Sequence, residues 1–216
     1  KKKYLLDNNY IISLTSGSTG NPKPIVLTQK TKLLRSYFTK KIYNLSSNSV
    51  IIASTPLYHS LALRLVLLPI IIGATSVILP GFSTKKWFGE VKKNNVTFSI
   101  LVSSQLENLI NYKKNIFDKL RNLKTIVSSS SKLNKLVRNK IEKLKFPNIY
   151  EIYGTSEIAG VTNFKINKNN NKIDSVGKKC SYASIKIIDD KNNILKPGSI
   201  GEIICKTPLI FSGYLD

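Results

Sequence analysis

The chain has 216 residues, 42% of them hydrophobic and 21% charged, with a formal net charge of +22. This composition excludes a disordered chain, and the length suffices for one globular domain or two small ones. Two cysteines and one histidine provide neither a disulfide framework nor a zinc site, so we expect a reducing compartment and a cytoplasmic protein.

The positive charge is compatible with nucleic acid, an anionic membrane surface or an anionic substrate as partner. The lysines are spread along the chain, which favours a solvated basic surface, and no nucleic acid is expected. Residues 61–79 are the strongest membrane candidate, but Arg64, Pro69 and Gly73 interrupt them, so no transmembrane segment is predicted, while peripheral contact with an anionic membrane fits the charge. Because methionine is absent, even at the first position, we expect an internal segment of a longer protein. No signal-peptide pattern is present.

Hydrophobic periodicity predicts alternating strands and helices over the first three quarters of the chain. The predicted elements, in chain order, are a hairpin of 10–14 and 25–27, a helix over 29–42 with Thr28 as its N-cap, a strand at 50–54, a helix over 60–72, a strand at 75–79, a helix over 83–93, a strand at 97–102, a helix over 104–111, a strand at 125–128, a helix over 133–143 and a strand at 148–152. This alternation is typical of parallel strands with helices on both faces of the sheet.

From residue 160 the helical periodicity ends, and strands are predicted at 161–164, 184–189 and 202–206, separated by turns. The expected fold class is therefore α/β, with a mostly parallel sheet and flanking helices, followed by a smaller antiparallel β-rich subdomain. We place the first subdomain, which includes the N-terminal hairpin, at 1–158 and the second, incomplete one at 159–216.

The hairpin connection, residues 15–23, has the sequence TSGSTGNPK. Glycine lets the backbone approach a ligand closely, successive free N–H groups form a concave anion site, and lysine adds a positive charge. The spacing differs from the Walker P-loop, which also joins a strand to a helix. The segment predicts a polyphosphate site, although a solvated turn has the same composition.

Three further polar segments follow predicted parallel strands, at 55–60, 128–131 and 153–157. Ligands of open α/β sheets bind at the carboxyl ends of the strands, so these segments should lie along one edge. The last one, YGTSE, offers an aromatic face for a base, two hydroxyls and a carboxylate that suits Mg²⁺. As alternatives to a binding site, the segment 153–157 could be only a solvated transition from strand to loop, and His59 in the segment 55–60 could have no functional role.

Together and in this order, the segments resemble the AMP-forming adenylating enzymes, a family of acyl- and aryl-CoA ligases, peptide-synthetase adenylation domains and luciferases. TSGSTGNPK resembles T-S-G-[ST]-T-G-x-P-K, PLYH resembles P-L-[FY]-H, YGTSE resembles Y-G-x-T-E, and SVGK, KPGSIGEI and SGY resemble the segments that follow. The resemblance implies activation of a fatty or aryl carboxylic acid by ATP through an acyl-adenylate. The histidine segment favours transfer to CoA over loading of a carrier-protein thiol, which stays an alternative.

The resemblance also implies roles for individual residues. The residues expected to hold the phosphates are Thr15, Ser16, Gly17, Ser18, Thr19, Gly20 and Lys23. Those expected around the adenine are Ser129, Ser130, Ser131, Tyr153, Gly154, Thr155 and Ser156. Lys23, Glu157 and His59 are implied as catalytic, with Glu157 and Thr15 holding Mg²⁺ and His59 bordering the acyl pocket.

Two of the departures from the family pattern bear on the expected nucleotide site. Ser129–Ser131 stand where the family carries Gly-Gly-Ala, and serine would be strained at a position that needs positive φ. Pro24 replaces a glycine and removes one backbone donor. Because the family's C-terminal domain lies outside this sequence, we expect weak nucleotide binding and little catalysis from the segment alone. A non-catalytic nucleotide-binding relic, or a basic module that binds nucleic acid or another polyanion, is the alternative from another class.

Overall fold

The computed structural model describes residues 6–15, 21–112, 116–144, 148–167 and 174–215. A seven-stranded sheet runs through its centre in the order β4 (Thr75–Ile78), β3 (Val50–Ala53), β5 (Phe98–Val102), β6 (Thr125–Ser129), β7 (Ile149–Thr155), β8 (Ala159–Ile166) and β9 (Lys178–Lys179). The strands from β4 to β7 are parallel, and β8 and β9 are antiparallel to their neighbours. The α/β class with a mostly parallel sheet is therefore confirmed.

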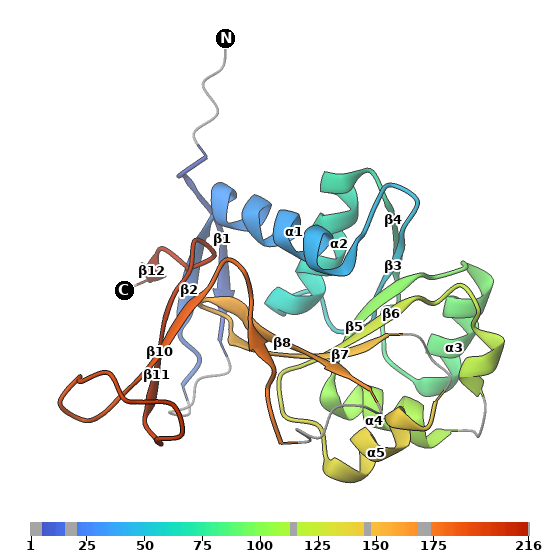
Figure 1. The fold of residues 1–216 in the computed structure, drawn as a ribbon. Helices are drawn as coiled ribbons and strands as arrows, with labels where there is room; N and C mark the ends of the chain where they lie inside the picture. Colours follow the sequence, from blue (N-terminus) through green and yellow to red (C-terminus); the bar gives the residue numbers. More distant parts are fainter. Residues whose placement is uncertain (1–5, 16–20, 113–115, 145–147, 168–173, 216) are drawn as a thin grey trace.

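Helices cover both faces of this sheet (Figure 1). One face carries α1 (Gln29–Tyr43) and α2 (Ser60–Ile72), and the other carries α3 (Thr84–Lys93), α4 (Ser103–Tyr112) and α5 (Lys135–Glu142), with a 3₁₀ turn, η1, at Ile116–Lys119. Alternation along each strand divides the core, because side chains of successive strand residues point to opposite faces. In β3, Ile51 packs with the α2 residues Leu65 and Leu68, whereas Ile52 packs with Trp87 of α3.

Local signals fix the helix boundaries that position the site. The hydroxyl of Thr28 accepts a hydrogen bond from the Thr31 N–H, so the predicted N-cap of α1 is confirmed. Helix α2 begins after His59 and ends at Gly73, whose φ of 72° is one that glycine adopts without strain. Among the described helices, none is long and apolar enough to cross a bilayer.

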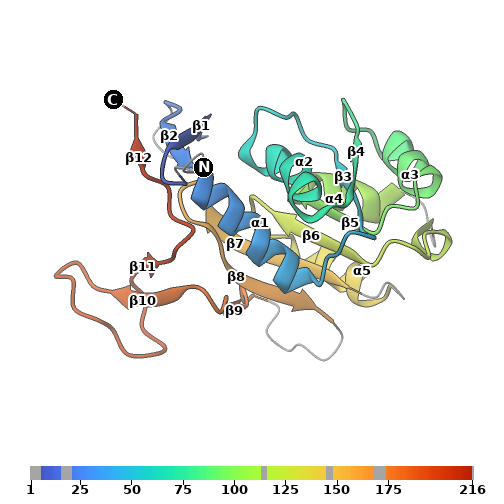
Figure 2. The same cartoon turned by 90° about the horizontal axis from the view of Figure 1, so that it is seen from above.

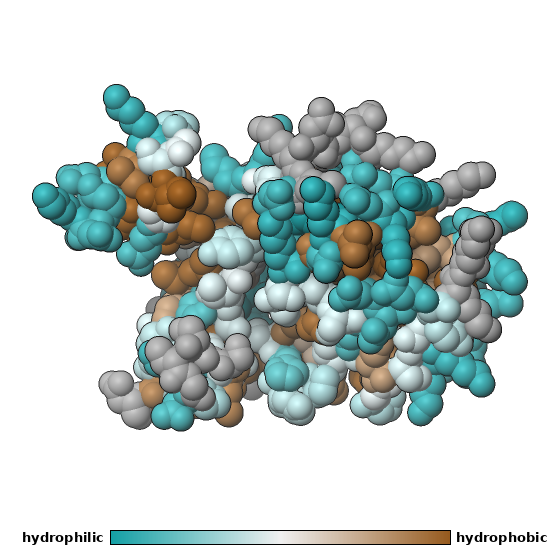
Figure 3. All heavy atoms as spheres, turned by 90° about the horizontal axis from the view of Figure 1, so that it is seen from below, coloured by the Kyte–Doolittle hydropathy of each residue, from teal (hydrophilic) through white to brown (hydrophobic). Residues whose placement is uncertain are grey.

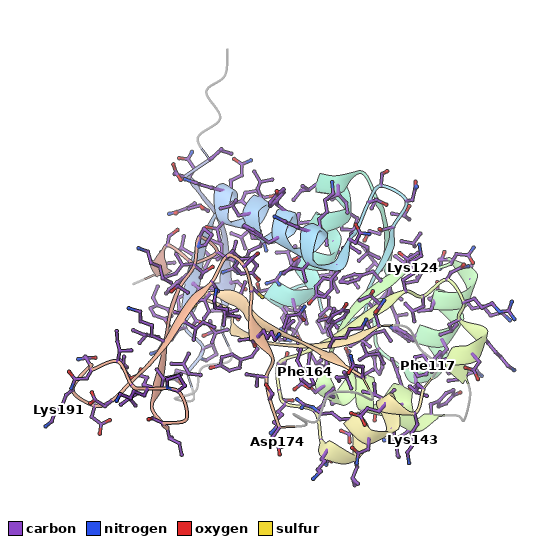
Figure 4. All side chains as sticks on the ribbon, viewed as in Figure 1. Phe117, Lys124, Lys143, Phe164, Asp174 and Lys191 are labelled. Atoms are coloured by element: carbon purple, nitrogen blue, oxygen red, sulfur yellow. The ribbon has the colours of Figure 1, made fainter. Side chains whose placement is uncertain are left out.

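Two small antiparallel sheets flank the large one. The predicted hairpin is present as β1 (Asn9–Leu14) and β2 (Pro24–Thr28), and β12 (Gly213–Tyr214) pairs with β2. The second sheet consists of β10 (Ser184–Ile188) and β11 (Glu202–Lys206), which project from the body (Figure 2). Lys191 lies at the tip of this arm in Figure 4, and apolar residues gather on it in Figure 3.

The structure places the start of the predicted second subdomain inside the large sheet. Strand β8 pairs with β7 along its length, from Ile149 opposite Ile166 to Thr155 opposite Ala159. The predicted boundary at residues 158 and 159 therefore falls in a tight turn between two hydrogen-bonded strands. The sequence hides this because a three-residue turn and a polar strand end look like an ordinary loop. The division into two subdomains stays a prediction.

Candidate functional site

The carboxyl ends of the parallel strands open into a cleft of about 380 Å³. Its walls come from the hairpin, the first turns of α2, the end of β6 and the β7–β8 turn. All four predicted segments contribute to the lining, three of them with Thr15, with Ser129 and Ser130, and with the run from Gly154 to Glu157. From the segment 55–60, Ser60 lines the cleft. The parallel sheet thus gathers these segments at one edge, as the sequence predicts.

The two ends of the predicted phosphate loop are held together. The Thr15 N–H and hydroxyl both donate to the Lys23 carbonyl oxygen, at 3.0 and 3.2 Å, and the Lys23 N–H donates to the Thr15 hydroxyl oxygen at 3.3 Å. Thr15 is almost fully buried at the cleft, while Lys23 is exposed. Residues 16–20, predicted to hold phosphates, lie outside the described residues.

Tyr214 connects the two predicted catalytic residues Lys23 and Glu157. Its hydroxyl donates to Glu157 Oε1 at 3.1 Å, and the Lys23 ammonium lies 5.5 Å from the centre of its ring. This distance is within the range of a cation–π interaction. The sequence indicates no role for Tyr214, because the SGY segment resembles the family pattern without an indicated function. The pairing of β12 with β2 brings Tyr214 next to Glu157, which lines the cleft.

The Glu157 carboxylate is held in its charged form. Partial burial raises its pKa, but hydrogen bonds from the Thr155 hydroxyl, its own backbone N–H and Tyr214, with the charge of Arg35, lower the pKa overall. A carboxylate that stays ionised and keeps oxygens facing a cleft suits a hard cation such as Mg²⁺. Among the described residues, no group of three or more histidine, cysteine or acidic side chains lies close enough to hold a metal.

Arg35 of α1 fixes the backbone of the same turn. Its Nη2 donates to the Glu157 carbonyl oxygen at 2.9 Å and to the Leu209 carbonyl oxygen at 2.8 Å, and the Phe211 N–H donates to the Glu157 carbonyl at 2.7 Å. Arg35 is 2% exposed. The carbonyl of Glu157 is therefore anchored to both α1 and the C-terminal segment, which orients its side chain toward the cleft.

The predicted adenine segment contains the strained position that the sequence indicated. Ser130 has a φ of 82°, in the left-handed region that favours glycine. Ser130 and Gly154 line both the cleft and a neighbouring hollow of about 120 Å³, where Tyr153 also lies. Tyr153 is 37% exposed. The segments at the ends of β6 and β7 are therefore adjacent, as the prediction of an adenine site requires.

Gly154 is required by protein packing. A Cβ built on it would overlap the carbonyl oxygen of Ala159, at the bulge where β7 and β8 pair. The resemblance places Gly154 at the adenine, and the close approach that the structure shows is that of the facing strand. The signal, a glycine just before a strand reversal, was present in the sequence.

A buried ion pair holds the chain next to the predicted adenine segment, Ser129–Ser131. Arg138 Nη2 lies 2.6 Å from Glu151 Oε2, and the side chains are 1% and 4% exposed. Glu151 Oε1 accepts the Leu133 N–H at 3.1 Å, which fixes the chain just after Ser131. The Ser103 hydroxyl donates to the Ser131 carbonyl oxygen from the other side.

His59 does not line the cleft; its neighbour Ser60 does. The imidazole is exposed, makes no side-chain cap for α2 and lies 4.4 Å from the Tyr58 ring, centre to centre. The structure thus places His59 beside the cleft wall, and its predicted role at the acyl pocket stays a prediction.

Three cations approach the inner end of the cleft from α1 and α2. Lys32 and Arg35 are 5% and 2% exposed, and Arg64 lines the cleft. Burial, reinforced by the charges of Arg64 and Arg35, lowers the pKa of Lys32 to about 7. Sequence reasoning missed this cluster because its members lie on two helices, and a periodicity pattern does not show how two helices pack against each other.

Comparison with known proteins agrees with this geometry. A family model described as AMP-binding enzyme matches residues 3–215. The chain is 27% identical over 206 residues to an indoleacetate–CoA ligase of Aromatoleum aromaticum. This match covers 94% of this chain and 40% of the relative. It is 25% identical over 210 residues to a long-chain-fatty-acid–CoA ligase of Bacillus subtilis, covering 94% and 37%.

Solved structures share the fold. The O-succinylbenzoate coenzyme A synthetase of Bacillus subtilis in complex with ATP and magnesium has a TM-score of 0.86 at 20% identity, covering 97% of this chain and 43% of that chain. ATP-bound MatB from Rhodopseudomonas palustris has a TM-score of 0.85 at 21% identity, covering 97% and 41%. The chain therefore spans about two fifths of the length of these proteins.

Proposed function

The chain belongs to the AMP-binding enzyme family, and from this premise we propose that the intact protein activates a carboxylic acid with ATP and transfers the acyl group to CoA. The observation that carries the proposal is that Thr15, Ser130 and Glu157, from three distant parts of the sequence, line one cleft. Relatives named as acid–CoA ligases support the reaction class, and the bound ATP and magnesium of a related structure support the cofactors.

In the first step, a carboxylate oxygen of the acid attacks the α-phosphorus of ATP. The bond from this phosphorus to the oxygen that bridges to the β-phosphate breaks, so pyrophosphate leaves and an acyl-adenylate forms. Lys23 would bind the leaving phosphates, where its charge offsets the negative charge that develops in the transition state. Its contact with the Tyr214 ring keeps the ammonium at the loop entrance.

Glu157 and Thr15 are the residues that would hold Mg²⁺. They fit because the Glu157 carboxylate is ionised at the cleft and because Thr15 faces the same cleft. When bound, Mg²⁺ supplies positive charge shared between phosphate oxygens. In the second step, the CoA sulfur would attack the acyl carbonyl carbon and AMP would leave.

ATP–pyrophosphate exchange by the intact protein tests the first step. Lys23→Ala and Glu157→Ala should each lower kcat/KM for exchange about 10²-fold, the size of effect seen when one group that stabilises transition-state charge is removed. Lys124→Ala and Glu202→Ala are matched controls, because both residues are exposed and Lys124 lies at the amino end of β6, the opposite edge from the cleft (Figure 4). Unchanged exchange in both cleft variants would refute the assignment.

The identity of the acceptor thiol needs its own measurement. Mass spectrometry of a reaction with ATP, acid and CoA should detect the acyl-CoA product, and formation of the acyl-adenylate without any acyl-CoA would favour a carrier-protein thiol. The basic-module alternative predicts instead binding of polyanions that weakens steeply with salt whether or not ATP is present. Such binding without any exchange would support that alternative.

A further inference from the structure

Arg64 of α2 lies at the inner end of the cleft. It lines the cleft of about 380 Å³ and also a narrower hollow of about 20 Å³ behind it. Ile152, Ala159 and Gly160 line both spaces, so Arg64 lies at their junction. The residues that we propose for Mg²⁺, Thr15 and Glu157, line the cleft but not the hollow. A carboxylic acid that reaches inward from the α-phosphate therefore extends toward Arg64.

The Arg64 guanidinium has no counter-ion within the described part of the chain. Its Nε is buried without a hydrogen-bond partner, and none of the ion pairs between described residues includes it. Burial lowers its pKa, with Tyr182 and Tyr43 acting in the opposite direction. Lys32 and Arg35, which lie nearby, are themselves cations. The one acidic side chain among the described residues that line the cleft, Glu157, acts on Arg35 and is not among the groups that affect the pKa of Arg64. The inner end of the cleft is thus strongly positive.

We propose that the acid activated at this site carries a second carboxylate, which Arg64 binds at the inner end of the cleft. This inference rests on the proposed function and names its substrate class, a short dicarboxylic acid. A guanidinium offers donors in a fork that matches a carboxylate, and a buried ion without a partner is costly, so a ligand that brings the opposite charge removes that cost.

The shape of the site also favours a short diacid over a long fatty acid. The hollow behind Arg64 has room for about one water molecule, so an alkyl chain cannot continue past the guanidinium. A methyl-terminated chain that stopped at Arg64 would bury the charge further without a hydrogen bond, which costs free energy. A second carboxylate at that distance instead pairs with it.

Pyrophosphate exchange with matched pairs of acids tests the inference on the intact protein. The pairs are succinate with butanoate, glutarate with pentanoate and adipate with hexanoate, which differ by one terminal carboxylate. The wild-type protein should prefer the diacid of its best pair by at least about tenfold in kcat/KM, a difference of about 1.4 kcal/mol in transition-state binding. Arg64→Leu should remove that preference, Arg64→Lys should keep part of it, and Arg121→Leu, an exposed arginine, should leave it unchanged.

A binding readout separates this inference from the proposed function. Thermal unfolding of the wild-type protein with each acid does not depend on catalysis, and the diacid should raise the melting temperature more than its monoacid partner. A higher melting temperature with the diacid, but no pyrophosphate exchange, would refute the proposed ligase activity and still support the binding site at Arg64. Exchange that favours monoacids, with a ratio that Arg64→Leu does not change, would overturn the inference and leave the ligase activity standing. If Arg64→Leu does not fold, the ratio of kcat/KM for the diacid to that for the monoacid is compared between the wild-type protein and Arg64→Lys, and equal ratios would overturn the inference.

Discussion

Replacing Ser130 by glycine should stabilise the protein, although glycine usually destabilises. Ser130 lies just beyond β6 at the proposed adenine site, with a φ of 82°. An L-residue in the left-handed region brings its Cβ close to the following carbonyl oxygen, which costs about 1–2 kcal/mol, and glycine has no Cβ. Ser130→Gly removes this cost while leaving the backbone where it is.

The magnitude follows from two opposing contributions. Glycine gains freedom in the unfolded chain, which lowers the free energy of unfolding by about 0.4–1 kcal/mol. Relief of the left-handed strain raises it by about 1–2 kcal/mol, so the net gain is on the order of 1 kcal/mol. Ser131→Gly is the matched control, because Ser131 is also exposed and is not among the residues with positive φ. It should pay the entropic cost alone.

Urea unfolding of both variants, followed by circular dichroism, measures these free energies. The entropic contribution is common to both changes, so the difference between them should equal the strain at Ser130, about 1–2 kcal/mol in favour of Ser130→Gly. If Ser130→Gly were less stable than Ser131→Gly at an unchanged m-value, the left-handed conformation would not be the one adopted in solution.

Two further predictions concern packing and burial. Gly154→Ala should lower the free energy of unfolding by at least about 1–3 kcal/mol because its Cβ would overlap the facing strand, whereas Gly89→Ala in α3, where a Cβ meets nothing within 4 Å, should raise it by about 1 kcal/mol in the same urea assay. Folding lowers the pKa of Lys32 from the ordinary 10.5 to about 7, so between these two pH values the unfolded chain binds the Lys32 proton and the folded chain does not. The free energy of unfolding should therefore rise with pH across that window. Lys32→Met should remove that part of the rise, and equal slopes for both proteins between pH 7 and 10 would contradict it.

The sequence predicted the parallel sheet well because each strand and each amphipathic helix has its own local signal. Helix α2 has its predicted bounds, and β3 and α3 differ by one residue at an end. The parallel arrangement then places the polar segments after β6 and β7 at one edge, without knowledge of any contact. The predicted strain among Ser129–Ser131 is confirmed at Ser130 because it follows from backbone sterics alone.

Features that depend on pairing between distant segments could not be predicted in this way. Strand β7 runs three residues past its predicted end because β8 folds back on it, and a periodicity window cannot detect a partner strand. The short strands β9 and β12 have two residues each and carry no periodicity at all. The cluster of Lys32 with Arg35 and Arg64 arises only when α1 and α2 pack side by side.

The contacts of residues 209–215 explain how the two halves of the site come together. Lys23 lies just before β2 of the small hairpin sheet, whereas Glu157 lies in the turn between β7 and β8 of the large sheet. The Ser212 N–H donates to the Val26 carbonyl, while the Phe211 N–H donates to the Glu157 carbonyl, so adjacent peptide groups bond the hairpin on one side and the β7–β8 turn on the other. Tyr214 also joins the two parts, because its ring lies against the Lys23 ammonium and its hydroxyl donates to Glu157. The phosphate-binding and metal-binding parts of the proposed site are therefore set relative to each other by a segment that, by itself, carries no catalytic group.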